Sequence, residues 1–166
     1  VQPGAADGKD MYVSEPNPIG QHGDLEYLES RFSATGYRRY MVILFDLSSV
    51  PSGSTIVSAT LSLWKHSLGT TDVIITPYAV LGANSSWAEL ASWDYAVVAT
   101  TRWAGDTGSD GGTDAGCSVS GTDYNVTSLG SFNAAAADPA DTQYQVALAT
   151  NQMQSMLTAN YGMVLT

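Results

Sequence analysis

Residues 37–66 read YRRYMVILFDLSSVPSGSTIVSATLSLWKH, which divides into two apolar runs joined by a connector rich in Ser, Pro and Gly. In the first run, residues 40–45, apolar side chains occupy both alternating sets of positions, which predicts a strand that is covered on both faces. In the second run, residues 57–64, apolar and hydroxyl-bearing side chains alternate, which predicts a strand with one buried face. Pro51 and Gly53 favour a turn in the connector. We therefore expect a long central β-hairpin.

The register of this hairpin decides which residues share its outer face. With the connector centred on Pro51, Trp64 lies opposite Arg38, and Ser62 lies opposite Tyr40. A slip of one residue would turn these partners to the other face. Aromatic rings that stack on sugar C–H groups, beside polar groups that bond sugar hydroxyls, predict a carbohydrate-binding site made of these four residues. The alternative, in which another segment covers Trp64, stays open at this point.

The remaining segments predict a single all-β sandwich of the jelly-roll kind that spans residues 1–166. Pro77 cannot donate to a ladder, so its strand is expected at a sheet edge or with a bulge. The further strands are expected at residues 10–13, 25–29, 72–80, 96–101, 124–129, 144–148 and 161–166, with one short helix over residues 150–158.

Composition narrows the class of partner. Charged residues make up 13% of the 166 residues, about half the usual share, and the net charge is −10. An acidic chain without clustered Lys and Arg excludes nucleic acid and insertion into an anionic membrane as expected partners. A neutral polysaccharide suits this charge, whereas an acidic one would need bridging cations. A single cysteine, Cys117, excludes an internal disulfide. The chain begins at Val1 with no signal-like run, so we expect a processed or excised extracellular domain.

A second group of aromatic residues comprises Trp87, Trp93 and Trp103, with Glu89 between the first two. It has two interpretations, a second aromatic binding site or a structural layer that covers one end of the sandwich. We favour the structural interpretation because tryptophan is usually largely buried. Buried indole N–H groups then need acceptors, and Glu89 is a candidate.

A glycine-rich loop, residues 105–116, contains Asp106, Asp110 and Asp114 at intervals of four. Carboxylate oxygens on a flexible backbone suit Ca²⁺, which makes calcium the one cofactor that the sequence suggests. The spacing is not that of an EF-hand, and Asp–Gly loops form ordinary turns without any ion. Both interpretations stay open.

Catalytic motifs are missing from the sequence. Neither His22 nor His66 lies in a known catalytic motif, and no G-x-S-x-G, H-E-x-x-H, P-loop or G-x-G-x-x-G pattern occurs. We therefore expect a protein without catalytic activity. Loop carboxylates are plentiful, so a polysaccharide lyase or hydrolase is kept as a third alternative.

Several segments together resemble the DNRLRE domain, whose members include carbohydrate-binding module family 96. They are DMYV (residues 10–13), RRYMVILFDLSSVPSGSTIVSATLSLW (38–64), SSWAELASWDY (85–95), RWAGD (102–106) and TANYGMVLT (158–166). The resemblance implies a β-sandwich in an extracellular setting, attached to polysaccharide-acting enzymes or surface proteins. It does not imply a catalytic centre.

The resemblance also implies a further loop and strand after the NYG-x-x-L segment, whereas this chain ends at Thr166. A missing strand would leave an open sheet edge at residues 161–166, through which the protein could associate with itself or another chain. The leading prediction is a non-catalytic extracellular carbohydrate-binding or adhesion module. The alternative is a structural building block of a surface filament, appendage or virus particle that assembles through this edge.

Overall fold

The computed structural model describes residues 8–31, 37–51, 53–67, 69–108 and 111–166. The structure is all-β with one short α-helix late in the chain, as predicted. The strands are β1 (Gly8–Ser14), β2 (Arg39–Phe45), β3 (Thr60–Trp64), β4 (Val73–Ile75), β5 (Pro77–Val80), β6 (Tyr95–Val97), β7 (Thr101–Arg102), β8 (Tyr124–Ser128), β9 (Phe132–Ala134), β10 (Gln143–Ala147) and β11 (Met163–Leu165). The helical segments are a 3₁₀ turn (Gly82–Asn84) and α1 (Thr150–Met156).

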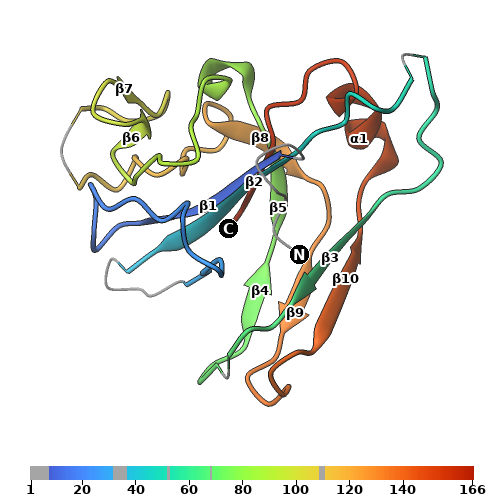
Figure 1. The fold of residues 1–166 in the computed structure, drawn as a ribbon, viewed down its shortest axis with the longest axis horizontal. Coiled ribbons are helices and arrows are strands. Elements are labelled where there is room, and N and C mark those ends of the chain that lie inside the picture. Colours follow the sequence, from blue (N-terminus) through green and yellow to red (C-terminus); the bar gives the residue numbers. More distant parts are fainter. Residues whose placement is uncertain (1–7, 32–36, 52, 68, 109–110) are drawn as a thin grey trace.

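A five-stranded antiparallel sheet forms the middle of the molecule, in the order β1-β2-β11-β5-β8 (Figure 1). On β2, Val42 lies opposite Met11 of β1 on one side and opposite Val164 of β11 on the other. Successive β2 side chains point to opposite faces, and Val42 and Ile43 are both buried. The prediction that this strand is covered on both faces is confirmed.

β2 and β3 do not pair with each other, so the predicted hairpin is wrong. Both edges of β2 are occupied by β1 and β11, and β3 pairs with β10 instead. The two strands need different surroundings, because β2 is apolar on both faces whereas the hydroxyl-rich face of β3 must meet water. Asp46 ends β2 by accepting a hydrogen bond from the Ser48 amide at 2.8 Å, which forms an Asx turn. After this turn the chain enters a second layer, where β3 begins at Thr60 (Figure 1).

The second layer, called here the outer layer, consists of the paired strands β3–β10 and β4–β9. Figure 1 shows these four strands together on one side of the central sheet. β9 and β10 belong to separate ladders but lie next to each other, and the rings of Phe132 and Tyr144 contact each other with centroids 5.3 Å apart. The order across the layer is therefore β4-β9-β10-β3.

The first hydrophobic core fills the space between the central sheet and the outer layer. Ile43 and Leu165 contribute from the central sheet, and Leu61 contributes from β3. The side chains of Met153 and Met156 add the apolar face of α1 to this core, because residues three apart lie on the same helix face. Fully burying one side chain of this size stabilises the fold by about 1.5–3 kcal/mol.

The opposite face of the central sheet packs against a tryptophan layer, defined here as the segment between β5 and β8. Trp87, Trp93 and Trp103 are each at most 1% exposed and share one core with Val42 and Val164. Figure 1 shows this segment, which contains β6 and β7, beside the central sheet and away from β3 and β10. The molecule therefore has three layers, with the central sheet in the middle.

Three strand predictions differ from the structure. The strand predicted at residues 96–101 is instead a turn at residues 98–100 between two short paired strands, β6 and β7. Residues 25–29 form no strand; Leu25 and Leu28 pack on the first core, so their spacing reflects burial of an irregular segment rather than a ladder. Residues 72–80 form two strands that separate at Thr76, with β4 in the outer layer and β5 in the central sheet. Pro77 is the first residue of β5, and this strand carries a register shift, as expected for a bulge. It does not lie at a sheet edge, because β11 and β8 flank it.

The open edge predicted at residues 161–166 is also wrong. β11 lies inside the central sheet, where Val164 faces Val42 of β2 on one side and Tyr78 of β5 on the other. The amides and carbonyls of Thr76 and Thr166 continue this pairing with two hydrogen bonds of 3.0 and 3.1 Å. Both sides of β11 are therefore occupied within the chain.

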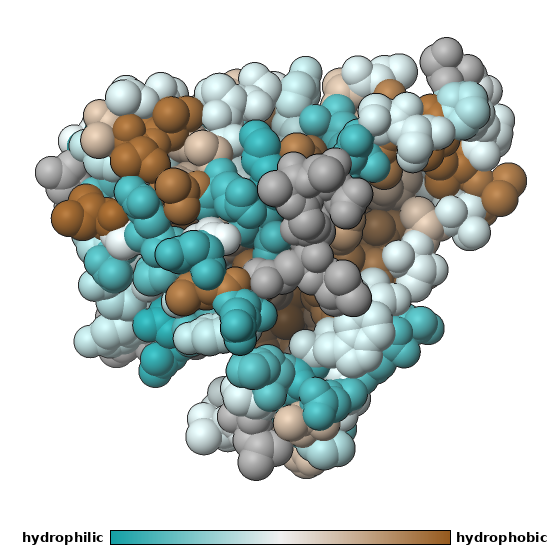
Figure 2. Space-filling view, viewed as in Figure 1, coloured by the Kyte–Doolittle hydropathy of each residue, from teal (hydrophilic) through white to brown (hydrophobic). Residues whose placement is uncertain are grey.

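Apolar residues on the molecular surface are dispersed on the side drawn in Figure 2. Several separate brown groups lie there among teal and white residues. Within the described part of the chain, no helix has the length and apolar character needed to cross a membrane.

Candidate functional site

Trp64 is the exposed tryptophan of this protein. Its side chain and backbone together are 49% exposed, whereas the other three tryptophans of the sequence are at most 1% exposed. The alternative in which another segment covers Trp64 is therefore wrong. Burying apolar area is favourable, so an exposed ring of this size offers an area that a ligand could cover.

The surroundings of Trp64 follow from the pairing of β3 with β10. Trp64 lies opposite Gln143, and Ser62 lies opposite Gln145. Side chains alternate along both strands, so that Leu61 is buried while its neighbours point away from the core. We call the outward set the β3–β10 face; it consists of Thr60, Ser62, Trp64, Gln143, Gln145 and Ala147. Hydroxyl and amide groups on this face offer both hydrogen-bond donors and acceptors beside one indole ring.

The predicted site of four residues is only half assembled. Ser62 and Trp64 share the β3–β10 face, but Arg38 and Tyr40 lie at the start of β2 beside the tryptophan layer. The Arg38 guanidinium lies 5.0 Å from the ring centre of Trp93, and the Tyr40 ring lies 5.9 Å from the same indole. The prediction failed because it assumed pairing between β2 and β3.

Arg38 has a structural role in its actual position. It donates two side-chain hydrogen bonds to Glu15, at 3.0 and 3.1 Å, and one to the Thr113 carbonyl at 2.7 Å. Burial by itself would raise the pKa of Glu15, but the hydrogen bonds and the positive charge of Arg38 hold that pKa below its usual value. Arg38 therefore links the turn after β1 to the tryptophan layer.

A loop held by Lys65 flanks the Trp64 end of the face. The Lys65 Nζ donates to the carbonyls of Ala135, Ala136 and Asp138 at 2.7, 3.2 and 2.6 Å. The Tyr144 hydroxyl donates to the Asp138 carboxylate at 2.9 Å. The ammonium charge of Lys65 is thus directed into the loop, which stays fixed beside β10.

A stacked pair of aromatic rings follows Trp64 along the chain. His66 lies against Tyr27 with ring centroids 5.3 Å apart and an angle of 5° between the planes. Both residues are exposed. His22, the other histidine, is stacked in the same manner on Tyr12 at 4.3 Å, and desolvation followed by the charge of Arg39 lowers its pKa. The two histidines therefore stack on different tyrosines.

The structural interpretation of the other tryptophans is confirmed. The indole N–H groups of Trp87, Trp93 and Trp103 each donate to a backbone carbonyl at 2.8 Å. These acceptors are the carbonyls of Tyr161, Gly112 and Ser92, respectively. The prediction that Glu89 accepts one of these bonds is wrong, because the backbone already satisfies all three indoles.

Two of the three aspartates proposed for calcium bond within the protein, and Asp110 lies outside the described residues. The Asp106 carboxylate accepts hydrogen bonds from Arg102 at 2.8 Å and from the Gly108 amide at 2.7 Å. The Asp114 carboxylate accepts from the amide and the hydroxyl of Thr107. Among the described residues, no group of three or more potential metal ligands comes together. Calcium stays a prediction, which calorimetry with Ca²⁺ and with EDTA would test.

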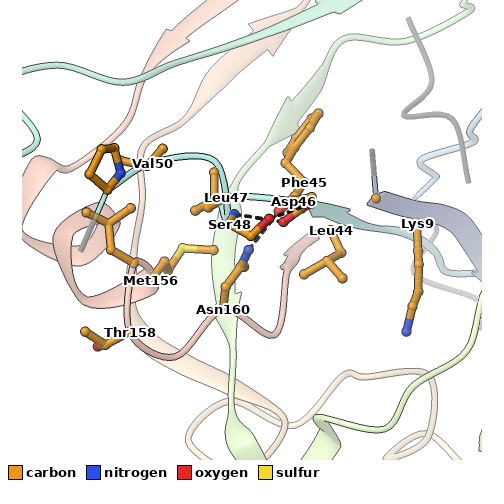
Figure 3. Close-up of a pocket in the computed structure, with 13 residues that line it drawn as sticks. Lys9, Leu44, Phe45, Asp46, Leu47, Ser48, Val50, Met156, Thr158 and Asn160 are labelled. Carbon is orange, nitrogen blue, oxygen red and sulfur yellow. Dashed lines mark hydrogen bonds between the residues drawn. The ribbon is translucent and has the colours of Figure 1, made fainter. Parts of the chain in front are cut away.

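An open groove of about 770 Å³ lies between the end of β2 and the end of α1. Figure 3 shows its polar side chains, which already bond the protein. Asp46 bonds Ser48, and Asn160 donates to the Phe45 carbonyl at 2.7 Å. The Lys9 ammonium donates to the Trp87 carbonyl at 3.0 Å. Because ligand sites need polar groups free to orient a ligand, the β3–β10 face is the better candidate.

Comparison with known proteins adds no relative. The chain matches no protein-family model, no curated protein and no solved structure. The resemblance to the DNRLRE domain therefore stays a prediction, and function is inferred from the β3–β10 face.

Proposed function

We propose that the protein is a non-catalytic carbohydrate-binding or adhesion module that acts outside the cell and binds polysaccharide through the β3–β10 face. The observation that carries the proposal is the 49% exposure of Trp64 among hydroxyl and amide side chains. An indole face accepts the C–H groups of a sugar ring, and the amides of Gln143 and Gln145 match sugar hydroxyls as donors and acceptors.

The energetics favour a ligand on this surface. About half of an indole side chain left in water corresponds to roughly 100 Å² of apolar area, and covering it would contribute about 2 kcal/mol. The pairing of β3 with β10 fixes the backbone from which these side chains project, which reduces the entropy lost on binding. Trp64 is therefore expected to be the main anchor of the site.

The alternative function, assembly into a filament or particle, needs an edge other than β11. In the central sheet the outer strands are β1 and β8, and in the outer layer β3 lies at one margin. Stable assemblies bury extended and largely apolar interfaces. On the side drawn in Figure 2 the apolar residues lie in several groups among polar ones rather than in one continuous surface.

Trp64→Ala tests the proposed function. Affinity electrophoresis in gels with hydroxyethyl cellulose, xylan, galactomannan, laminarin, alginate or polygalacturonate measures retention. We expect retention of the wild-type protein by at least one neutral polysaccharide. The Trp64→Ala protein should lose it, because truncation of a central aromatic anchor costs about 2 kcal/mol or more, roughly a 30-fold loss of affinity. The melting temperature should change little.

Ile19→Ala serves as the control, since Ile19 is 69% exposed and its neighbour Pro18 accepts a hydrogen bond from the Asp94 amide in the tryptophan layer. It should bind like the wild type. Equal retention of wild-type and Trp64→Ala proteins would contradict the proposal. Self-association in size-exclusion chromatography without retention by any polysaccharide would favour the building block, and release of reducing ends or unsaturated products would reveal a hydrolase or lyase.

A further inference from the structure

One row of outward side chains crosses the whole outer layer. Trp64 faces Gln143 across β3 and β10, and Ile74 faces Asn133 across β4 and β9. The two pairs are joined at the boundary between β9 and β10, where the Phe132 and Tyr144 rings contact each other; Phe132 packs on the first core, and Tyr144 alternates with the exposed Gln143 and Gln145. Side chains alternate between the two sides of a strand. When two residues on antiparallel strands meet on one side, the residues that follow and precede them meet on the other side. β9 and β10 are not paired by backbone hydrogen bonds, but the ring contact brings the two strands together at this point, and Asn133 and Gln143 are each one residue from a contacting ring. The row therefore runs from Trp64 through Gln143 and Asn133 to Ile74.

The two ends of this row are apolar and exposed, and its middle is polar. Trp64 is 49% exposed and Ile74 is 69% exposed, while Asn133 and Gln143 are exposed amides. Paired strands lie about 4.8 Å apart, and β9 and β10 are neighbours without backbone pairing, so the two ends of the row are at least about 14 Å apart, the length of a short run of sugar rings. Each end offers an apolar surface for a ring, and the amides between them can bond hydroxyls.

The outward side chains of the outer layer carry no charge. The β3–β10 face has none, and neither Asn133 nor Ile74 adds one. Lys65, which follows Trp64, directs its ammonium group into the loop carbonyls. The protein as a whole has a net charge of −10, which repels a polyanion. Charge therefore matches a neutral ligand and opposes an acidic one.

We propose that the outer layer binds a neutral, extended polysaccharide along a track that crosses its four strands from Trp64 to Ile74, which rests on the proposed function. Trp64 and Ile74 hold the two ends of the bound segment, and Gln143 and Asn133 bond its hydroxyls between them. The track makes affinity depend on chain length, because a disaccharide covers Trp64 alone while a longer oligosaccharide reaches Ile74.

The test combines chain length with substitutions at the far end of the track. Titration calorimetry follows binding of cellobiose, cellotriose, cellotetraose and cellohexaose, and of the matching xylan-, mannan- and laminarin-derived series. Ile74→Ala and Asn133→Ala should each weaken binding of the longest bound oligosaccharide by about fivefold, while binding of the disaccharide stays as in the wild type. Val126→Ala is the matched control, because Val126 is 70% exposed on β8 of the central sheet. It should bind like the wild type.

The outcomes distinguish failure of the track alone from failure of the proposed function. If Trp64→Ala loses binding while Ile74→Ala and Asn133→Ala bind every oligosaccharide like the wild type, the track is overturned and the proposed function stands. If alginate or polygalacturonate binds more tightly than any neutral polysaccharide, the neutral ligand class is overturned. If Trp64→Ala binds like the wild type, or if nothing in either set of polysaccharides binds, the proposed function fails together with the track. Melting curves of all variants should match the wild type, because the substituted side chains are exposed.

Discussion

Asn84 and Asp123 form a buried polar pair that connects three parts of the tryptophan layer. The Asn84 amide donates to the Asp123 carboxylate at 2.9 Å and accepts from the Ala104 backbone amide at 2.8 Å. The same carboxylate accepts from the backbone amides of Gly105 and Val119, at 2.8 and 2.9 Å. Both side chains are at most 1% exposed. Burial without these bonds would be costly, so the pair fixes how the loops meet.

Removing one partner of this pair should be strongly destabilising. Asn84→Ala leaves the Ala104 amide without its acceptor and removes one of the three donors that the described residues supply to the Asp123 carboxylate. We expect the free energy of unfolding to fall by about 2–3 kcal/mol in a urea titration. The control is Asn125→Ala, since Asn125 is partly exposed and its side chain bonds only the Thr127 amide among the hydrogen bonds of the structure. Equal losses for the two variants would contradict the role of the buried pair.

Single residues differ in how far the sequence reveals their role. Trp64 shares its alternating set with Thr60 and Ser62, so its outward direction follows from local sequence once a strand is assumed. Arg38 and Tyr40 were placed beside it only through an assumed partner strand. Their actual neighbour, Trp93, lies far along the chain and no local pattern indicates it.

At the level of elements, alternation predicts strands better than it predicts their partners. β2 was identified as a strand covered on both faces, and it is, but its partners are β1 and β11 rather than β3. The partner β11 is more than a hundred residues away in sequence, and the choice depends on which strands can bury both faces of β2. Residues 25–29 alternate like a strand but form none. An irregular segment that packs on a core can show the same alternation of apolar and polar residues as a strand.

Gln143 and Gln145 were missed as site residues although a signal was present. They alternate with Tyr144 and Val146, so the sequence allowed an outward amide set on β10. The sequence did not predict that β10 pairs with β3, because residue spacing within one strand gives no information about the neighbouring strand. The amide half of the β3–β10 face could therefore be found only from the fold.

The loop between β9 and β10 is the element that Lys65 holds in place. The Lys65 ammonium donates to three carbonyls of this loop, and the Asp72 carboxylate accepts a further bond from the Ala136 amide at 2.8 Å. Charged groups with several hydrogen-bond partners give stronger contacts than neutral pairs. The loop therefore gives β10, and Gln143 at its start, a fixed position.

Lys65→Met should loosen this loop without unfolding the protein. We expect the amides of Ala136 and Asp138 to exchange hydrogen at least about tenfold faster, with a loss of about 1–2 kcal/mol in the free energy of unfolding. Lys9→Met is the matched control, because the Lys9 ammonium donates to the Trp87 carbonyl on a different surface. Its loop amides should exchange as in the wild type. Unchanged exchange in the Lys65→Met protein would show that other contacts hold the loop.

For the whole molecule, the layered architecture separates stability from binding. Three tryptophans of the sequence stabilise one side of the central sheet, and the fourth lies exposed on the outer layer at the other side. A site built on paired strands keeps its shape more accurately than a site on loops. The outward side chains of the outer layer are uncharged, so the acidic residues behind the net charge of −10 lie elsewhere. The surfaces that keep the protein soluble therefore differ from the surface that selects the ligand.

The most direct measurement follows the four indole N–H signals of the protein during titration with cellohexaose, xylohexaose, mannohexaose and laminarihexaose by nuclear magnetic resonance. Trp64 is assigned as the signal that disappears in the Trp64→Ala spectrum. With at least one of these sugars, the Trp64 signal should move in a saturable manner, while the signals of Trp87, Trp93 and Trp103 stay in place because their N–H groups are bonded to backbone carbonyls. A Trp64 signal that stays unchanged with every sugar, or movement confined to the other three indoles, would contradict binding through the β3–β10 face.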